Sequence, residues 1–205
     1  ELMKTAGDAL LCVFRYQINE NEENVSLRDL SIRAIQCGLE IQRSHSSFET
    51  EQGHELTLHI GIGAGKIYSL YVGGVDSSWE FLVTGEPLAQ LRTCVDLSST
   101  GEVVVSSKVW NLISSYFEGN CIEDSENKDW LVTKVIQSKI IDVSPLPQLQ
   151  PKSENFEIAA RCFIPKAVQV QIDSNQTKWM DELRIVTVLF VKLNSPIPSS
   201  SMDEF

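Results

Sequence analysis

The residues with the clearest chemical potential stand at the start of the chain, in Lys4-Thr-Ala-Gly-Asp-Ala-Leu-Leu11. Two apolar, strand-like runs meet there at Gly7-Asp8, a dipeptide typical of tight hairpin turns. Such a turn holds the Asp8 carboxylate rigidly and leaves it open to solvent. A divalent cation needs a ligand with both properties. Taken alone, Gly-Asp is more often an ordinary turn than a metal ligand, so the elements that follow decide its meaning.

Charge and composition limit what the chain can bind. Its 205 residues carry a net charge of -11 with a pI near 4.7, and 42% of them are hydrophobic. This composition suits a globular domain and argues against a nucleic-acid binder, because no basic stripe is available to replace phosphate counterions. A nucleotide bound together with metal ions remains compatible with it. No apolar run predicts a transmembrane segment, and no signal peptide opens the sequence.

The cysteines point to a reducing compartment. They are five in number, widely spaced and without a CxxC pair: Cys12, Cys37, Cys94, Cys121 and Cys162. Several lie in apolar runs, which predicts reduced core thiols in a cytoplasmic protein. Peripheral association with a membrane or an organelle remains open.

The elements that must position Asp8 begin with a helix and a strand. Ser26 is a suitable N-cap for a helix over 27–48. Its buried stripe is expected to follow helical spacing: Leu27, Leu30, Ala34, Cys37 or Gly38, and Ile41. Alternation predicts a strand over 55–63, with its apolar face packed on helices. The opposite face of that strand, small and polar, is expected to be free to line a cleft.

The later elements alternate between strands and helices. We expect strands at 66–72, 79–84 and 103–105, helices at 87–96 and from Ser106 to about 117, and a β-rich edge to residue 143. This order predicts an α/β or α+β fold, with helices covering one face of a mainly antiparallel sheet. The chain opens and stops in strand-like residues, which suggests a piece of a longer protein.

The order of four motifs resembles the catalytic domain of class III nucleotidyl cyclases, an α+β, ferredoxin-like fold. The motifs are residues 4–11, His-Ile-Gly-Ile-Gly-Ala-Gly (59–65), Phe-Leu-Val-Thr-Gly-Glu-Pro-Leu-Ala (81–89), and the helix carrying Arg92. Within the family, the first catalytic half of the soluble, bicarbonate-responsive adenylyl cyclases is the most similar. The resemblance implies a partial catalytic domain at 1–143 that lacks its N-terminal part, a linker at 144–181, and the first strand of a second cyclase domain at 182–205.

The resemblance also implies a reaction. Family members convert ATP to 3',5'-cyclic AMP and pyrophosphate at an interface between two halves, with two Mg²⁺ or Mn²⁺ ions held by two aspartates. Asp8 matches the second aspartate, and the first is expected upstream of Glu1. This chain would therefore supply one protein ligand and be inactive without the rest of the protein.

Four further positions match binding residues of the family. Lys4, Val83 and Arg92 match a bicarbonate site, in which fixed cationic donors bind a small anion. The anion would act by releasing an ion pair between Arg92 and the metal-site aspartate. His59 stands where the family commonly has a lysine that contacts the nucleotide phosphates. A histidine is only partly charged near neutral pH, so it predicts weaker and more pH-dependent phosphate binding.

Alternative interpretations stay open at this point. Without the resemblance, Lys4 and Arg92 would be interpreted as ordinary surface charges. For His59, a strand residue hydrogen-bonded to a neighbour is as good an interpretation as a phosphate ligand. The whole domain could be a catalytically degenerate, cyclase-like module that binds a nucleotide or anion for regulation. Specificity for GTP is a third possibility, because the base-reading residues would come from the second half. The spacing of Gly61-Ile-Gly-Ala-Gly-Lys66 fits no phosphate-loop or dinucleotide fingerprint.

Overall fold

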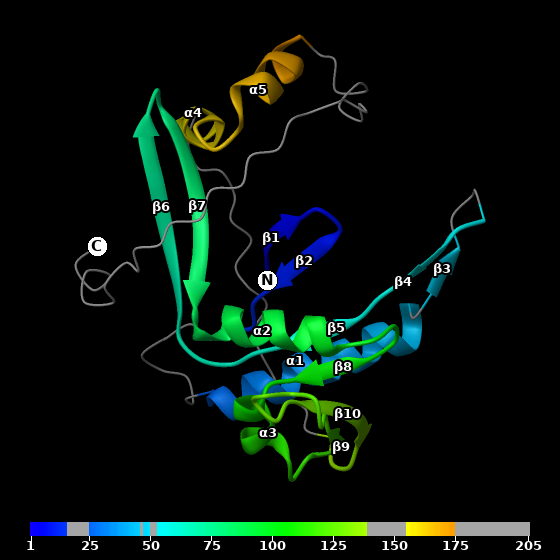
Figure 1. The fold of residues 1–205 in the computed structure, drawn as a ribbon. Coiled ribbons are helices and arrows are strands. Elements are labelled where there is room, and N and C mark those ends of the chain that lie inside the picture. Colours follow the sequence, from blue (N-terminus) through cyan, green and yellow to red (C-terminus); the bar gives the residue numbers. More distant parts are fainter. Residues whose placement is uncertain (16–24, 46, 50–52, 139–154, 175–205) are drawn as a thin grey trace. The chain divides into compact units, whose positions relative to one another are not determined.

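The structure is a computed structural model that describes residues 1–15, 25–45, 47–49, 53–138 and 155–174. It divides into two compact units, residues 1–152 and 153–205. The second-domain strand expected at 182–205 lies outside the described residues. Figure 1 shows the elements of both units.

The first unit contains most of the secondary structure. In chain order its elements are β1 (Leu2–Ala6), β2 (Ala9–Cys12), α1 (Leu27–His45), β3 (Ser47–Glu49), β4 (Glu55–Thr57), β5 (Ile60–Ile62), β6 (Ile67–Val75), β7 (Ser78–Gly85), α2 (Glu86–Leu97), β8 (Val103–Val105), α3 (Ser107–Ile113), β9 (Phe117–Cys121) and β10 (Trp130–Val135). This mixture confirms the α+β class. Among the described residues, no helix has the length and apolar character needed to cross a lipid bilayer.

A four-stranded mixed sheet forms the centre of this unit, with the strand order β5-β8-β10-β9. β5 and β8 are parallel, and β10 is antiparallel to both of its neighbours. Three antiparallel hairpins, β1–β2, β3–β4 and β6–β7, form separate two-stranded sheets. The long β6–β7 hairpin leads directly into α2 (Figure 1).

The hydrophobic core lies between the sheet and two helices, α1 and α3. Its buried members include Ile32, Ile35, Ile62, Val103, Val105, Val109, Ile113, Phe117 and Val132. The buried face of α1 only partly matches the expected stripe: Leu30 and Gly38 are buried as expected, and the other buried residues are Ser31, Ile32, Ile35 and Gln42. Leu27 and Ile41 are more than one-third exposed. The helix is therefore rotated by about one residue from the expected face.

The second face of the sheet is also covered by a helix, which differs from the arrangement we expected. Ile60 contacts α1 at Gly38, whereas a β-carbon on Gly61 would meet Cys94 and Val95 of α2. Successive residues of a strand point to opposite faces, so α1 and α2 lie on opposite sides of β5. The small face of this strand is packed under α2 and does not line a cleft.

The continuous strand expected at 55–63 is broken into two. β4 pairs with β3, and β5 pairs with β8, so the chain changes sheets between Thr57 and Ile60. As a result, Leu56 and Leu58 are 56% and 44% exposed instead of packed on helices. The helix expected to reach 117 ends at Ile113, and Phe117 starts β9.

The cysteines are free thiols, but they are not mainly in the core. Only Cys94 is buried; Cys12, Cys37 and Cys121 are exposed, and Cys162 is intermediate. Cys94 lies in α2 against β5, where its thiol donates to the carbonyl oxygen of Ile62 at 3.8 Å.

Among its described residues, the second unit contains two short helices, α4 (Asn155–Arg161) and α5 (Lys166–Asp173), within the segment interpreted as a linker. Gln169 of α5 donates to the carbonyl oxygens of Arg161 and Ile164, both at 2.7 Å. Arg161 also pairs with Glu157 and Asp173. These contacts join the two helices into a helical hairpin.

Candidate functional site

Asp8 lies where the sequence predicts it, at the tip of a hairpin. Ala6 pairs with Ala9, so Gly7 and Asp8 form a two-residue turn between β1 and β2. Gly7 has a φ of +62°, which glycine adopts without steric cost. The Asp8 side chain is exposed, and among the described residues it makes no hydrogen bond or ion pair. Within the described part of the chain, no other group competes with a ligand for this carboxylate.

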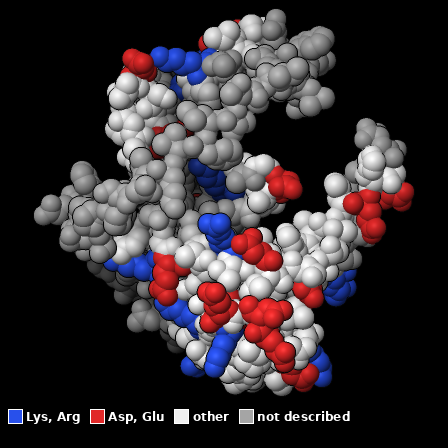
Figure 2. Space-filling model, in the orientation of Figure 1, with Lys and Arg blue, Asp and Glu red and all other residues white. Residues whose placement is uncertain are grey.

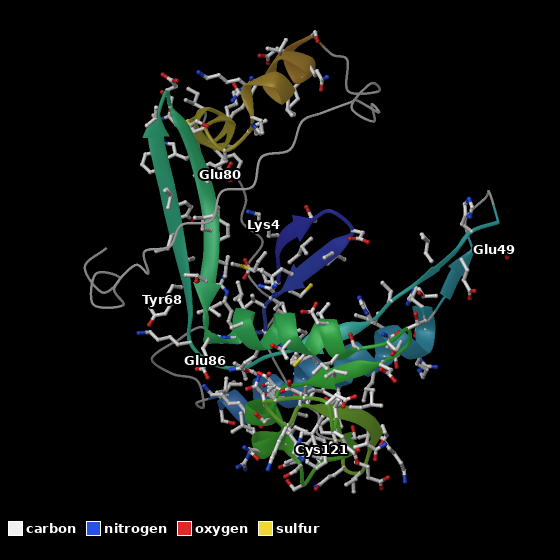
Figure 3. All side chains as sticks on the ribbon, viewed as in Figure 1. Lys4, Glu49, Tyr68, Glu80, Glu86 and Cys121 are labelled. Carbon is white, nitrogen blue, oxygen red and sulfur yellow. The ribbon has the colours of Figure 1, made fainter. Side chains whose placement is uncertain are left out.

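Lys4 lies on the first strand of the same hairpin, opposite Leu11. Figure 3 labels it on the β1 ribbon. Its side chain is exposed and, within the part of the chain that the structure describes, has no hydrogen-bonding or ionic partner. Lys4 and Asp8 thus share one small rigid element and carry opposite charges that neither uses internally.

The donor set fits a metal ion only as a single ligand. Among the described residues, no group of three or more His, Cys, Asp or Glu side chains could hold a metal. Mg²⁺ in nucleotide sites is commonly held by one or two carboxylates together with substrate phosphates and water. A free, exposed carboxylate such as Asp8 suits that role, with further ligands supplied by substrate and by other segments.

Val83 and Arg92 stand on either side of a glycine junction. Val83 is half-buried in β7 opposite Ser69. Two residues later Gly85 has a φ of +134°, and a β-carbon there would lie 2.5 Å from the carbonyl oxygen of Lys66. Only glycine fits this position, which turns the chain from β7 into α2.

Arg92 points out from α2 with little to restrain it. Its side chain is 87% exposed, and Nε lies 4.0 Å from Oδ2 of Asp96, one turn further along the helix. A contact of this length between exposed groups is weak. The guanidinium therefore has donors available for an anion.

His59 lies between β4 and β5, next to the C-terminal end of α2. Its Nδ1 is 3.0 Å from the carbonyl oxygen of Ser98, the C-cap residue of α2. Because a carbonyl can only accept, Nδ1 carries the proton and donates. The Nε2 atom remains as the second polar atom of an exposed ring.

The structure also contains a polar network at the start of α2, which the sequence did not lead us to expect. Lys108 of α3 donates to Glu86 at 2.7 Å, and this contact lowers the pKa of the Glu86 carboxyl. Gln90 bonds to Ala64 and to Ser106. Figure 3 labels Glu86 at this junction. One feature of the sequence indicates this network: Gln90 is a polar residue one turn into a helix face that is otherwise apolar.

The matched residues fall into two groups. Lys4 and Asp8 share the β1–β2 hairpin, and Val83 and Arg92 flank the β7–α2 junction. No hydrogen bond or ion pair among the described residues joins one group to the other. On the face shown in Figure 2, basic and acidic side chains are interspersed, and no basic track crosses its described surface.

Comparison with known proteins identifies relatives of this chain by sequence. No protein-family model matches it. It is 27% identical to adenylate cyclase type 10 of rabbit (Oryctolagus cuniculus) over 217 residues, and 27% identical to the human protein over 218 residues. These matches cover 94% of this chain but only 13% of each relative.

Solved structures show partial likenesses. The guanylyl cyclase domain of the RhoGC fusion protein from the fungus Blastocladiella emersonii, a monomeric double mutant, matches with a TM-score of 0.49 and 19% identity, over 67% of this chain and 71% of that one. The adenylyl cyclase CyaB from P. aeruginosa matches with a TM-score of 0.36 and 12% identity, over 58% and 65%.

The sequence relationship is to a nucleotidyl cyclase. It is a homology to the first catalytic region of adenylate cyclase type 10. The chain spans about one-eighth of the length of the relatives it matches.

Proposed function

We propose that this chain contributes the first half of a two-half adenylyl cyclase that converts ATP to 3',5'-cyclic AMP and pyrophosphate and responds to bicarbonate. The observation that carries the proposal is Asp8, an exposed carboxylate without a side-chain partner among the described residues, fixed by a glycine turn in a segment homologous to adenylate cyclase type 10. The second cyclase half of the full-length protein would complete the site. A cytoplasmic location is part of the proposal.

Asp8 would act as a ligand to Mg²⁺ or Mn²⁺. Two such ions, when bound, supply activation of the attacking ribose hydroxyl and neutralisation of the triphosphate charge. The contribution of this chain is a carboxylate that needs no rearrangement, since its turn is fixed by the pairing of Ala6 with Ala9. A backbone that is already held lowers the ordering cost of binding, which then falls on the side chain alone.

His59 would meet the phosphates of the nucleotide. Its Nδ1 is committed to Ser98, so Nε2 is the atom available to a phosphate oxygen. That nitrogen donates a hydrogen bond only in the imidazolium form, or in the other neutral tautomer after the Ser98 bond is lost. We therefore expect His59 to contribute less to phosphate binding than a permanently charged lysine would at this position.

Lys4, Arg92 and the backbone at Val83 would form the bicarbonate site. Lys4 has no internal partner among the described residues, and Arg92 has only the long contact to Asp96. A small anion could bind both cations without first breaking a strong ion pair. The bound anion would then compete with carboxylates for Arg92, including the aspartate that holds the metal.

The test is a cyclic AMP assay on the full-length protein with and without bicarbonate. We expect Asp8→Ala to abolish activity under both conditions. Arg92→Ala should keep a basal rate and lose the bicarbonate response. Unchanged behaviour of both variants would overturn the proposal.

A second candidate is a catalytically degenerate module that binds a nucleotide or anion. The observation that favours it is His59, which stands where the family commonly has a phosphate-contacting lysine and whose Nδ1 is engaged by the carbonyl oxygen of Ser98. Nucleotide binding by the full-length protein without cyclic AMP formation, whether Mg²⁺ or Mn²⁺ is supplied, would favour the module. Formation of cyclic GMP in preference to cyclic AMP would instead place the chain with guanylyl cyclases.

A further inference from the structure

The side-chain amide of Gln90 is fully engaged on the inner face of α2. The N–H of Ala64 donates to Oε1 at 3.0 Å, and Nε2 donates to the Ala64 carbonyl oxygen at 3.2 Å. The hydroxyl of Ser106 also donates to Oε1 at 2.7 Å, and Nε2 donates to Glu86 at 3.1 Å. One side chain thus holds both polar backbone groups of a loop residue and the N-cap residue of α3.

These bonds close a ring of contacts around the base of the long hairpin. From Ala64 the chain runs into β6, where Ile67 pairs with Gly85 at the end of β7. α2 begins at Glu86 and returns to Gln90 within about one helical turn. The bond between Gln90 and Ala64 therefore fixes the angle between α2 and the base of the β6–β7 hairpin.

Two close approaches leave this ring little freedom. Gly63 lies so near the Pro87 carbonyl oxygen that a β-carbon would overlap it. The ion pair of Glu86 with Lys108 lies over Gly65, where a β-carbon would come within 3.2 Å of both charged atoms. Close-packed groups of this kind transmit a displacement of one group to its neighbours.

The ring holds two of the three residues of the proposed anion site, Val83 and Arg92, in register. Val83 lies two residues before Gly85, and Arg92 lies two residues after Gln90. Positions two apart on a helix are separated by about 200°, so Arg92 faces away from the side that Gln90 anchors. Because the bonds of Gln90 help to hold the rotation of α2, they also help to set the direction in which the exposed Arg92 side chain leaves the helix.

We propose that Gln90 is a positioning residue of the bicarbonate site, an inference that rests on the proposed function. It touches neither anion nor nucleotide. It acts by holding α2, and with it Arg92, at a fixed angle to the strand that carries Val83. Loss of its amide would leave the polar groups of Ala64 and Ser106 without their partners and allow α2 to rotate or shift.

The experiment measures cyclic AMP formation by the full-length protein as bicarbonate is titrated at saturating ATP and Mg²⁺. We expect Gln90→Leu to raise the half-saturating bicarbonate concentration roughly fivefold, the factor that corresponds to one hydrogen bond of ordinary strength. Gln90→Glu should show a similar loss, because it removes the donor and places two carboxylates together. Adding Glu86→Gln to Gln90→Glu restores a donor–acceptor pair and should recover part of the response.

Gln42→Leu is the matched control. Gln42 of α1 also holds backbone carbonyls, those of Leu58 and Glu102, but at the far end of β5. It should lower the melting temperature without moving the half-saturating bicarbonate concentration. If Gln90→Leu and Gln42→Leu gave the same half-saturation, the inference would fail and the proposed function would stand.

Two further outcomes bear on the inference about Gln90 and on the proposed bicarbonate response. If Gln90→Leu does not fold, the comparison of Gln90→Glu with the Glu86→Gln double variant decides, and equal half-saturation in those two would count against the inference. A wild-type protein that forms cyclic AMP but ignores bicarbonate would overturn both this inference and the bicarbonate part of the proposed function.

Discussion

Gly63 and Pro87 are packed together so closely that no side chain fits between them. A β-carbon on Gly63 would overlap the Pro87 carbonyl oxygen and lie 3.0 Å from the β-carbon of Gln90. This contact joins the end of β5 to the first turn of α2, so it supports the same junction that carries Val83 and Arg92. The first prediction tests it.

Gly63→Ala should destabilise the protein by about 1–3 kcal/mol, the usual cost of forcing a side chain into a packed site. Gly38→Ala is the matched control, because its added methyl would meet Ile60 and Val103 at 3.6 Å, an ordinary contact distance. We expect this helical substitution to be neutral or slightly stabilising. Denaturant unfolding of both variants measures the difference. Equal stability in the two would show that α2 does not sit as close to β5 as described.

Asp96→Asn should strengthen the response to bicarbonate. Asp96 is the described carboxylate that contacts Arg92, at 4.0 Å, and an anion must compete with it. Since exposed pairs are weak, we expect the half-saturating bicarbonate concentration to fall only about two- to threefold, and less at high salt. Glu40→Gln, which removes the partner of Arg43 in α1, serves as the control. A rise in half-saturation for Asp96→Asn would contradict competition at Arg92.

Cys94 predicts a loss of stability at alkaline pH. Burial raises the pKa of this thiol from 9.0 to about 12, with a smaller contribution from the charge of Asp129. In the unfolded chain the thiol ionises at lower pH than in the folded chain. Between pH 9 and about pH 12 the folded state therefore binds more protons, and the free energy of unfolding falls as pH rises.

The measurement compares unfolding of the wild type and Cys94→Ala across that pH range. The variant should be less stable near neutrality, because it leaves a small cavity, and should lose less stability as pH rises. Cys37→Ala, at an exposed cysteine, should follow the wild type. Parallel curves for the wild type and Cys94→Ala would show that the thiol ionises equally in both states.

Local signals in the sequence predicted the strongest elements well. The Gly7-Asp8 turn appears as expected because glycine at a positive φ meets the requirement of a two-residue turn. The short strand Val103–Val105 also matches its expected bounds, since a run of buried β-branched residues has few alternatives. Both features depend on residues next to each other in the chain.

The errors came from contacts between distant segments. Alternation correctly separated the two faces of the strand only from Ile60 to Gly63, and it could not show that α2 covers Gly61. Nor could it show that β4 leaves to pair with β3. The role of Gln90 depends on a loop 26 residues earlier in the chain, at Ala64, and no local pattern encodes that contact.

The central claim is that Asp8 binds the catalytic metal, and a change of metal preference tests it most directly. We would measure cyclic AMP formation by full-length Asp8→Cys with Mg²⁺, Mn²⁺ and Cd²⁺, because a thiolate ligand favours softer metals than a carboxylate does. Asp76→Cys is the matched control, since Asp76 occupies the turn of the β6–β7 hairpin, where Val75 pairs with Ser78. We predict that Asp8→Cys loses activity with Mg²⁺ and regains part of it with Mn²⁺ or Cd²⁺, while Asp76→Cys keeps the wild-type preference. Full activity of Asp8→Cys with Mg²⁺ would contradict the account.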